Sequence, residues 1–306
     1  MRRIIRAHRA WRYWTLVLMF VFASAHAQEL EPRAYSNAPV GTTFLIAGFS
    51  RLRGPVLPDP TVPVENVQAD VDIYTLGWAR FFSVLGRSSS LAVVLPYAQA
   101  DLRGEVFDAP TQVHRAGFGD LHLRAAINLF GHPALAPAEF AKRPDRPAGG
   151  VSFAVVAPTG QYDSSRFVNV GTNRWAYKPD AGVSVPFGNW FSEAAAGVWI
   201  FGDNDDFRGG HRRSQEPLAV YQLHVGYNFR PGLWVAGNYG RAVGGRTAVD
   251  GAPNENEQHN SRVGVMLSLP VARGWSTRFG YSKGTAVRVG GDYDIVSVAL
   301  QYRWFD

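Results

Sequence analysis

Strict alternation of apolar and polar residues near the end of the chain constrains its fold more than any other feature. In residues 295–305 one parity is apolar: Val296, Val298, Leu300, Tyr302 and Trp304. The other parity is small or polar and includes Gln301 and Arg303. A period of two sends alternate side chains to opposite faces of a strand. One face is therefore predicted to be wet, while the other is apolar and ends in aromatic residues, which is typical of a transmembrane β-barrel.

Stretches with this signal follow one another along the chain, and about twelve can be counted. They cover residues 42–51, 67–82, 90–102, 120–129, 150–158, 180–187, 191–201, 221–229, 233–241, 262–269, 275–282 and 295–305. The parity is ambiguous only in 191–201. An even number of strands is expected of a bacterial barrel. We therefore predict an all-β fold in which residues 42–306 form one transmembrane antiparallel up-and-down β-barrel of about 12 strands.

The links between these stretches alternate in length, which supports a barrel independently. Tight turns are indicated at 86–88, 188–189, 230–232 and 273–274, where Gly, Asn and Pro gather. Longer polar or Gly/Pro-rich links cover 52–66, 104–115, 159–174, 202–216, 244–260 and 285–292. Short turns at one end and long loops at the other are typical of outer-membrane barrels. One link, 130–149, is long on the short side, and its residues 136–143 are predicted to form a single helical turn.

The first 27 residues have the three parts of a secretory signal peptide. Five arginines, at positions 2, 3, 6, 9 and 12, precede a short apolar run at 14–22 and an A-x-A cleavage site at 25–27. The alternative is a membrane anchor, but the run is shorter than the roughly 20 residues that a spanning helix needs. We expect cleavage before Gln28. Residues 28–41 are then expected either to extend into the periplasm or to occupy the barrel lumen.

The signal peptide also accounts for most of the net charge. The chain carries 31 Lys+Arg and 25 Asp+Glu, a formal charge of +6, and the signal contains five of the arginines and no acid. The mature chain is left with 26 basic and 25 acidic residues, a charge of about +1, which does not favour nucleic acid as a partner. There is no cysteine, so the fold contains no disulfide. Aromatic residues make up 13% of the chain, and Tyr and Trp favour membrane interfaces.

A soluble periplasmic β-sandwich or lipocalin-like barrel is the competing fold. Such proteins alternate too, but their inward set is apolar and their outward set is polar. Two observations favour the opposite sense here. The polar set contains many small residues, as a crowded lumen requires, and the apolar set carries aromatic residues near the strand ends.

Several short motifs spread over the mature chain identify a family. They are Glu31–Asn37 (EPRAYSN), Gly117–Leu121 (GFGDL), Phe201–Phe207 (FGDNDDF), Gly209-Gly210, Gln215–Leu218 (QEPL), Gln222 with His224, Phe229–Trp234 (FRPGLW), Gly244–Thr247 (GGRT), Asn260–Arg262 (NSR) and Gln301–Trp304 (QYRW). With these motifs the chain resembles the outer-membrane transporters of the phenol-degradation meta-pathway family. The resemblance implies transport of small molecules, aromatic or other hydrophobic compounds among them, and no catalytic residues or cofactor. In one departure from the usual barrel pattern, Asp306 follows the terminal aromatic Phe305, and the aromatic in register is Trp304.

Charged residues on the polar parity are the candidate functional residues. They are Asp70, Asp72, Arg80, Asp120, His122, Arg124, Glu193, His224, Arg262, Arg278 and Arg303. In a water-filled lumen such side chains would form a constriction and set charge selectivity. The alternative is that they pair with one another and make a narrow barrel rigid. Both interpretations place these side chains inside.

Metal binding and catalysis find little support in the sequence. Asp203, Asp205 and Asp206 form an acidic cluster on a long loop, but Phe207 stands where a calcium loop needs an oxygen ligand. His122 and His224 lie in no metal-binding motif, and no G-x-S-x-G elbow is present. We therefore predict no metal, no cofactor and no enzyme activity, and retain an outer-membrane enzyme as the less favoured alternative.

The sequence thus predicts a bacterial outer-membrane channel for passive uptake of small molecules. Its expected partners are outer-membrane lipids, the barrel insertion machinery and a small-molecule solute. A structural or surface-binding barrel without an open pore is the alternative. The solute, the pore radius, the oligomeric state and the loop conformations are not set by the sequence.

Overall fold

The computed structural model describes residues 30–36, 38–58, 64–107, 109–166 and 168–305. The predicted signal peptide, residues 1–27, and its cleavage site lie outside the described residues. The described chain is almost entirely β-structure. None of its helices is both long enough and apolar enough to cross a membrane.

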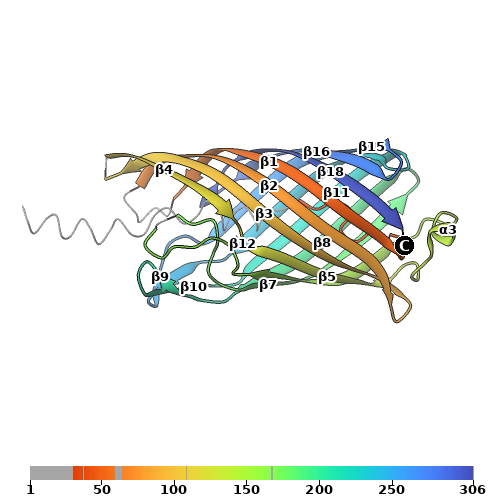
Figure 1. Cartoon of the computed structure of the whole chain (residues 1–306), viewed down its shortest axis with the longest axis horizontal. Helices are drawn as coiled ribbons and strands as arrows, with labels where there is room; N and C mark the ends of the chain where they lie inside the picture. Colours follow the sequence, from red (N-terminus) through yellow and green to blue (C-terminus); the bar gives the residue numbers. More distant parts are fainter. Residues whose placement is uncertain (1–29, 37, 59–63, 108, 167, 306) are drawn as a thin grey trace, which may run out of the picture.

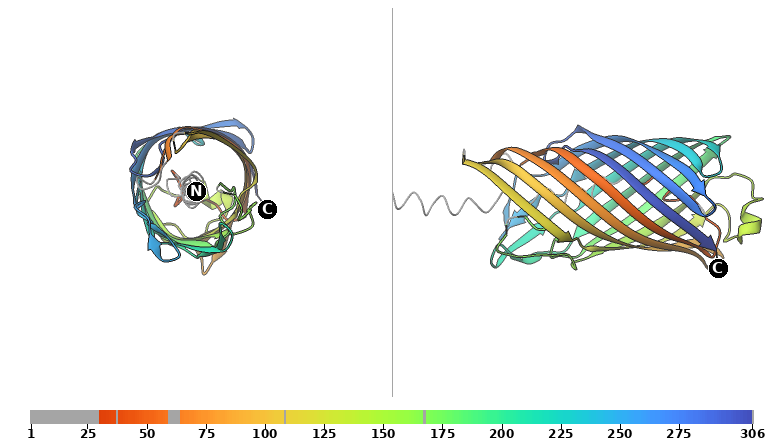
Figure 2. Two further views of the ribbon diagram at one scale, coloured as in Figure 1. Left: turned by 90° about the vertical axis from the view of Figure 1, so that its left-hand side faces the viewer. Right: turned by 45° about the horizontal axis from the view of Figure 1, so that its top comes forward.

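Twelve antiparallel strands close into one barrel, which confirms the predicted fold (Figure 1). In chain order they are β1 (Thr42–Leu57), β2 (Val64–Val84), β3 (Arg87–Val106), β5 (Leu121–Phe130), β6 (Ala148–Ala157), β7 (Ala176–Phe187), β8 (Trp190–Phe201), β11 (Leu218–Arg230), β12 (Leu233–Gly244), β15 (Gln258–Ala272), β16 (Trp275–Ala286) and β18 (Asp294–Phe305). Each strand pairs with the next, and β1 also pairs with β18, so the sheet has no end. Figure 2 shows the resulting ring along the barrel axis.

The two ends of the barrel differ in their connections. At the short-turn end, two-residue links join β2 to β3, β7 to β8, β11 to β12 and β15 to β16. One link at this end is long: it joins β5 to β6 and contains α3 (Pro137–Phe140), the single helical turn that the sequence predicted. The opposite end, the long-loop end, carries a small second sheet. Its strands are β9 (Asn204–Phe207), β10 (His211–Gln215), β13 (Thr247–Val249) and β14 (Ala252–Pro253).

One part of the barrel wall is interrupted. The long strand β3 pairs with β5 near the short-turn end and with β4 (Ala109–Phe118) near the long-loop end. The next strand, β6, pairs with β5 and β7 but not with β4, so within the described residues β4 has no strand partner on its other edge. The loop 158–175 covers that edge instead: Gln161 N donates to Phe118 O at 2.9 Å, and Arg115 Nε donates to Val168 O at 2.7 Å.

Over most of its height the barrel has an apolar outside. We call this zone the membrane belt. The outward parity of β11 is typical, with Leu223 53% exposed, and large exposed apolar side chains continue around the ring. They include Leu76, Phe153, Val265, Phe279, Val296 and Leu300. The inward parity is polar or small: Arg262, opposite Gly240 on β12, is only 2% exposed. This confirms the inside-out polarity that the sequence predicted.

The polarity reverses where β1 to β4 extend beyond the membrane belt. We call residues 50–57, 64–73, 98–106 and 109–118 the projecting sheet. A row of directly opposed rings, Phe49, Tyr74, Tyr97 and Phe118, marks its lower boundary, with ring centroids 5.3, 6.5 and 5.3 Å apart along the row. Such a row is an aromatic girdle of the kind found at membrane interfaces.

Inside the projecting sheet lies an apolar core. The inward residues Leu52, Val56, Val67, Val71, Ala100 and Leu102 pack with Val168 and Val170 of the loop 158–175 and with Val289 and Tyr293. Outside it the side chains are charged or polar, as in a water-soluble sheet. The loop 104–115 predicted from the sequence is therefore partly a strand, because β4 runs from Ala109 to Phe118.

Candidate functional site

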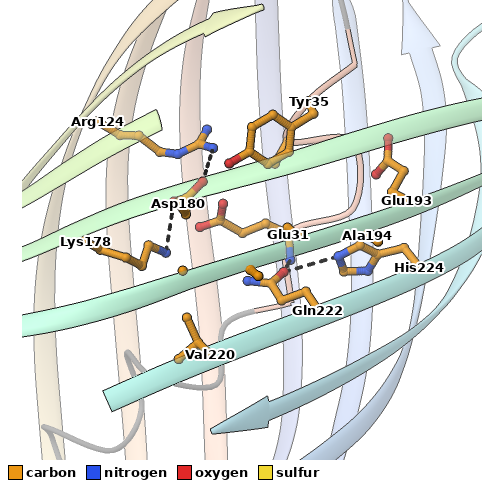
Figure 3. Close-up of a pocket in the computed structure, with 14 residues that line it drawn as sticks. Glu31, Tyr35, Arg124, Lys178, Asp180, Glu193, Ala194, Val220, Gln222 and His224 are labelled. Carbon is orange, nitrogen blue, oxygen red and sulfur yellow. Dashed lines mark hydrogen bonds and ion pairs between the residues drawn. The ribbon is translucent and has the colours of Figure 1, made fainter. Parts of the chain in front are cut away.

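The lumen contains the beginning of the described chain. Residues 30–36, which we call the lumen segment, lie inside the barrel (Figure 3). Residues 38–41 then lead to β1 at the short-turn end, where Val40 N donates to Leu135 O at 2.9 Å. Glu31 N donates to Gln222 Oε1 at 3.1 Å, and Ser36 Oγ donates to Glu193 at 2.9 Å. Arg33 N also donates to the Glu193 carboxylate. These contacts hold residues 30–36 against the inner wall of the barrel.

Small residues in the wall make room for the lumen segment. The ring of Tyr35 lies against Gly182, where an added Cβ would be 2.3 Å from a ring carbon. Leu30 likewise lies against Gly240 and Gly264, where a Cβ would be 2.9 and 3.0 Å from its side chain. The segment therefore packs against positions where glycine leaves space, which is a close approach that no other residue permits.

A charged network links three wall strands next to the segment (Figure 3). Asp180 of β7 accepts a hydrogen bond from Ser152 Oγ at 2.7 Å and lies 3.7 Å from Arg124 and 4.0 Å from Lys178. Arg124 Nε donates to Ser152 at 3.1 Å, and its guanidinium stands 5.5 Å from the Tyr35 ring. One carboxylate thus serves two cations, and the network ties β5, β6 and β7 together.

His224 is buried between amide side chains. Its Nδ1 lies 2.7 Å from Asn238 Oδ1, and its Nε2 lies 3.2 Å from Gln222 Oε1, the oxygen that also accepts from Glu31 N. The two ring nitrogens therefore bridge the side chains of Asn238 and Gln222. Its partners are amides rather than a serine, so His224 acts as a structural link to the lumen segment.

Beside the lumen segment lies a cavity of about 690 Å³. One side of it is apolar and comes from β1 to β3 and β18, with Ile46, Ile73, Val94, Pro96 and Ile295. The other side comes mainly from β5, β7 and β8 and carries the cations Arg124, Lys178 and Arg174 next to Trp199 and Phe201. The cavity therefore has an apolar face and a cationic face, and its size is in the range of small-molecule sites.

Cations and aromatic rings alternate along the β7–β8 side of the cavity. The Trp199 and Phe201 rings are nearly parallel, with centroids 6.3 Å apart. Lys178 Nζ stands 5.1 Å from the Trp199 ring, and the Arg174 guanidinium stands 4.5 Å from the Phe201 ring. Arg174, in the loop before β7, donates to Gln215 Oε1. Burial lowers the pKa of Arg174 to about 9, so it remains a cation at neutral pH.

Most of the charged residues proposed from the sequence face inward. They are Asp120, His122, Arg124, Glu193, His224, Arg262, Arg278 and Arg303. Asp120 holds the loop 158–175, accepting from Gly160 N and from Thr172 N and Oγ1. Arg262 Nη1 donates to Tyr293 O at 2.8 Å. Arg278 borders the cavity, and Arg303 lies at the short-turn end with its guanidinium 5.4 Å from the Phe305 ring.

Three of the proposed residues face outward, contrary to the prediction. Asp70 and Asp72 belong to the projecting sheet and pair with Arg51 at 3.1 and 3.5 Å, and Arg53 lies 2.9 Å from Asp70. Arg80 shares the outward parity of β2 with Tyr74 and Leu76, nearer the short-turn end. In the projecting sheet the outer parity of β2 is the polar one, because its inner parity enters the apolar core.

Several residues of the site were missed by the sequence analysis. Glu31, Arg33 and Tyr35 precede the first strand, where alternation carries no information. Trp199 lies in the one stretch whose parity was ambiguous, and small residues at Ala194, Ala195 and Ala196 explain that ambiguity. Asp180 was visible on the polar parity of the predicted stretch 180–187, whereas Lys178 lies two residues before that stretch. Extending the alternation of that stretch toward Ala176, where β7 begins, would have found both residues.

The acidic loop cluster is used in ion pairs. Arg212 of β10 is bound to Asp203 and lies 3.6 Å from Asp205. Among the described residues, no group of three or more His, Asp or Glu side chains could hold a metal ion. The cluster therefore contributes to the contacts of the small sheet.

Comparison with known proteins identifies relatives in family and in fold. A family model described as "Putative MetA-pathway of phenol degradation" matches residues 56–303. No curated protein matches the chain. Among solved structures, an outer membrane channel from Pseudomonas putida F1 is 20% identical with a TM-score of 0.77, covering 90% of this chain and all of that one. The transport unit of the autotransporter AIDA-I from Escherichia coli is 8% identical with a TM-score of 0.50, covering 93% and 95%.

Proposed function

This chain belongs to the family of the MetA-pathway of phenol degradation, and we propose that it is an outer-membrane channel for passive uptake of small, largely apolar molecules. The observation that carries this proposal is the cavity of about 690 Å³ inside a closed barrel with an apolar outside. An engineered cavity of about 150 Å³ holds benzene, so this one has room for a substituted aromatic ring and water. The short-turn end then faces the periplasm and the long-loop end faces outward.

The lining of the cavity supports solutes of mixed character. Its apolar side is formed by aliphatic residues such as Ile73 and Val94, which favour contact with a hydrocarbon or aromatic surface. Its other side offers cations and hydrogen-bond donors, which would orient a polar substituent. Bulky, strongly hydrated solutes such as disaccharides gain nothing from the apolar side, so we expect them to be poor solutes.

A barrel without an open pore is the second candidate function, and the lumen segment favours it. The lumen segment is anchored by hydrogen bonds to Glu193 and Gln222 and by the contact of its Tyr35 ring with Gly182. It therefore crosses the lumen between the cavity and the short-turn end. Transport would then require the segment to move. In the second candidate the segment stays in place, and the barrel binds its ligand without passing it on.

Liposome swelling separates the two candidates. Proteoliposomes containing the wild-type barrel or Glu193→Ala would be diluted into isosmotic arabinose, glycine, sodium benzoate or phenol, with protein-free liposomes as the baseline. A channel gives solute-dependent swelling above the baseline, which rises in Glu193→Ala because the segment loses its anchor. If neither protein passes any of the solutes faster than protein-free liposomes do, the channel proposal is overturned and the sealed barrel is favoured.

A further inference from the structure

We propose that the cavity is a binding site for aromatic carboxylates, and that Arg174 receives the carboxylate. This inference rests on the proposed function and names its solute class: a ring-sized apolar body that carries one negative charge. The site would be the first to meet a solute that enters from the long-loop end, because Arg174 lies in the loop that leads into β7 there.

The first observation is a buried cation at the cavity wall without a carboxylate partner. Arg174 is 4% exposed, and no described carboxylate lies within ion-pair distance of it. One terminal nitrogen donates to Gln215, and the other, Nη1, is buried with no hydrogen-bond partner among the described residues. A buried charge is costly unless it is paired and hydrogen-bonded. Binding of an anion would therefore satisfy a group that the protein leaves unsatisfied.

Nearby acids are already engaged elsewhere. Asp120 accepts three hydrogen bonds from the loop 158–175, from Gly160 N at 2.9 Å and from Thr172 N and Oγ1 at 2.9 and 2.6 Å. Asp203 is bound by Arg212 on the outer side of the small sheet. Neither carboxylate is positioned to turn toward Arg174 without giving up these contacts. These two acids, whose charges act on Arg174, are thus held by partners of their own.

A second observation comes from Arg278, on a different part of the same lining. Its guanidinium stands 5.7 Å from the Trp234 ring, its buried Nε has no hydrogen-bond partner, and no described carboxylate pairs with it. The cavity therefore carries two guanidinium groups without acid partners, one from the loop before β7 and one from β16. Two such groups would let an anion move between cationic positions instead of being held at one.

The apolar side of the cavity restricts the class of anion. Ile46, Ile73 and Val94 face the lumen across from the cations, and they would be left against water by a small inorganic anion. A neutral hydrocarbon would cover them but would leave Arg174 unsatisfied. A monocyclic aromatic carboxylate satisfies both sides, since its ring can contact the apolar residues while its carboxylate accepts charge-assisted hydrogen bonds from the guanidinium.

Equilibrium dialysis of the full-length mature barrel in detergent tests this inference, with benzoate and benzyl alcohol as probes. The two probes have nearly the same size and differ in charge. We expect benzoate to bind at least about tenfold more tightly, as one hydrogen-bonded ion pair implies. Arg174→Met should remove about tenfold of benzoate affinity and leave benzyl alcohol unchanged, and Arg278→Met should do the same to a smaller extent. Arg53→Met, on the outer face of the projecting sheet, is the matched control.

The outcomes distinguish this inference from the proposed function. Equal binding of both probes, or unchanged benzoate binding in Arg174→Met, overturns the carboxylate site while swelling in neutral solutes still supports a channel. Loss of binding of both probes in Arg174→Met would reveal a general collapse of the site and also overturn the inference. Heat-dependent gel mobility, which reports barrel folding, must be wild-type in each variant; should Arg174→Met fail this test, Arg174→Gln replaces it.

Discussion

The projecting sheet and the membrane belt are built from the same strands with opposite polarity. In β2 the outward parity holds Leu76 in the belt and Asp70 in the projecting sheet, while the inward parity changes from Thr75 at the cavity to Val71 in an apolar core. The change occurs at the row of rings through Tyr74. Alternation therefore tells which face of a strand meets water at each height, and it does not by itself tell which face meets the lumen.

The largest expected effect comes from placing the same charge on the outer face of each region. Leu223→Arg in the belt should destabilise the barrel by about 3 kcal/mol, since arginine on the lipid face near the midplane costs roughly 2–4 kcal/mol. Gln99→Arg on the outer face of the projecting sheet should change stability by less than about 0.5 kcal/mol. Urea unfolding in lipid vesicles measures both. Equal destabilisation would mean that the projecting sheet also lies in the bilayer.

Removing an inward side chain tests whether the projecting sheet has an apolar core that the membrane belt lacks. Leu102 is 1% exposed in the core of the projecting sheet, so Leu102→Ala should weaken that sheet by about 2–3 kcal/mol through lost burial and a residual cavity. Hydrogen exchange of residues in β1 to β4 is the measurement, because the loss is expected to be local. The matched change, Leu223→Ala in the belt, leaves no internal cavity. Faster exchange confined to β11 in Leu102→Ala would contradict the assignment of the core.

Inside the membrane belt, polar contacts hold the lumen segment in place of an apolar core, and Glu193 makes two of them. Glu193→Ala removes the acceptor of hydrogen bonds from Arg33 N and Ser36 Oγ, which should weaken docking of the lumen segment by about 2 kcal/mol. Planar-bilayer recording should then show a higher single-channel conductance. Because the chain has no cysteine, a spin label on Ala34→Cys reports the segment directly, and its mobility should rise in the Glu193→Ala background. Unchanged mobility would contradict the anchoring role.

The smallest effect is expected in the small sheet at the long-loop end, which has polar contacts in place of a core. The Arg212 backbone N–H and the His211 side chain lower the pKa of Asp250. The folded sheet therefore gains stability from this carboxylate above its unfolded pKa and loses it as pH falls through the lower folded pKa. Hydrogen exchange of β10 and β13 should accelerate slightly with acid, and Asp250→Asn should abolish that dependence. A pH dependence that persists in Asp250→Asn would point to another group.

Much of the belt could be predicted from sequence because lipid imposes one rule on every strand. The parities of β11, β15, β16 and β18 follow directly from alternation, and so does the inward position of His224 on β11. The rule failed at Asp70 and Asp72, since above the ring row the water lies outside and the core inside. It also failed at β4, whose strand was assigned to a loop for want of a clear apolar parity.

The candidate site was only half predictable for a related reason. Strand periodicity places side chains such as Arg124 and Arg278 inside, but it does not tell what meets them there. The contacts of Glu31, Arg33 and Tyr35 depend on residues about 150 to 190 positions away in the sequence. That Gly182 and Gly264 leave room for Tyr35 and Leu30 is visible only in three dimensions. The loop residue Arg174 carries no periodic signal at all.

The lumen segment precedes β1, the strand whose pairing with β18 completes the ring. Because its own backbone joins it to the wall, a segment that leaves its contacts in the lumen stays attached to the barrel and can return to them. Its displacement would therefore be reversible, unlike the loss of a separate blocking molecule.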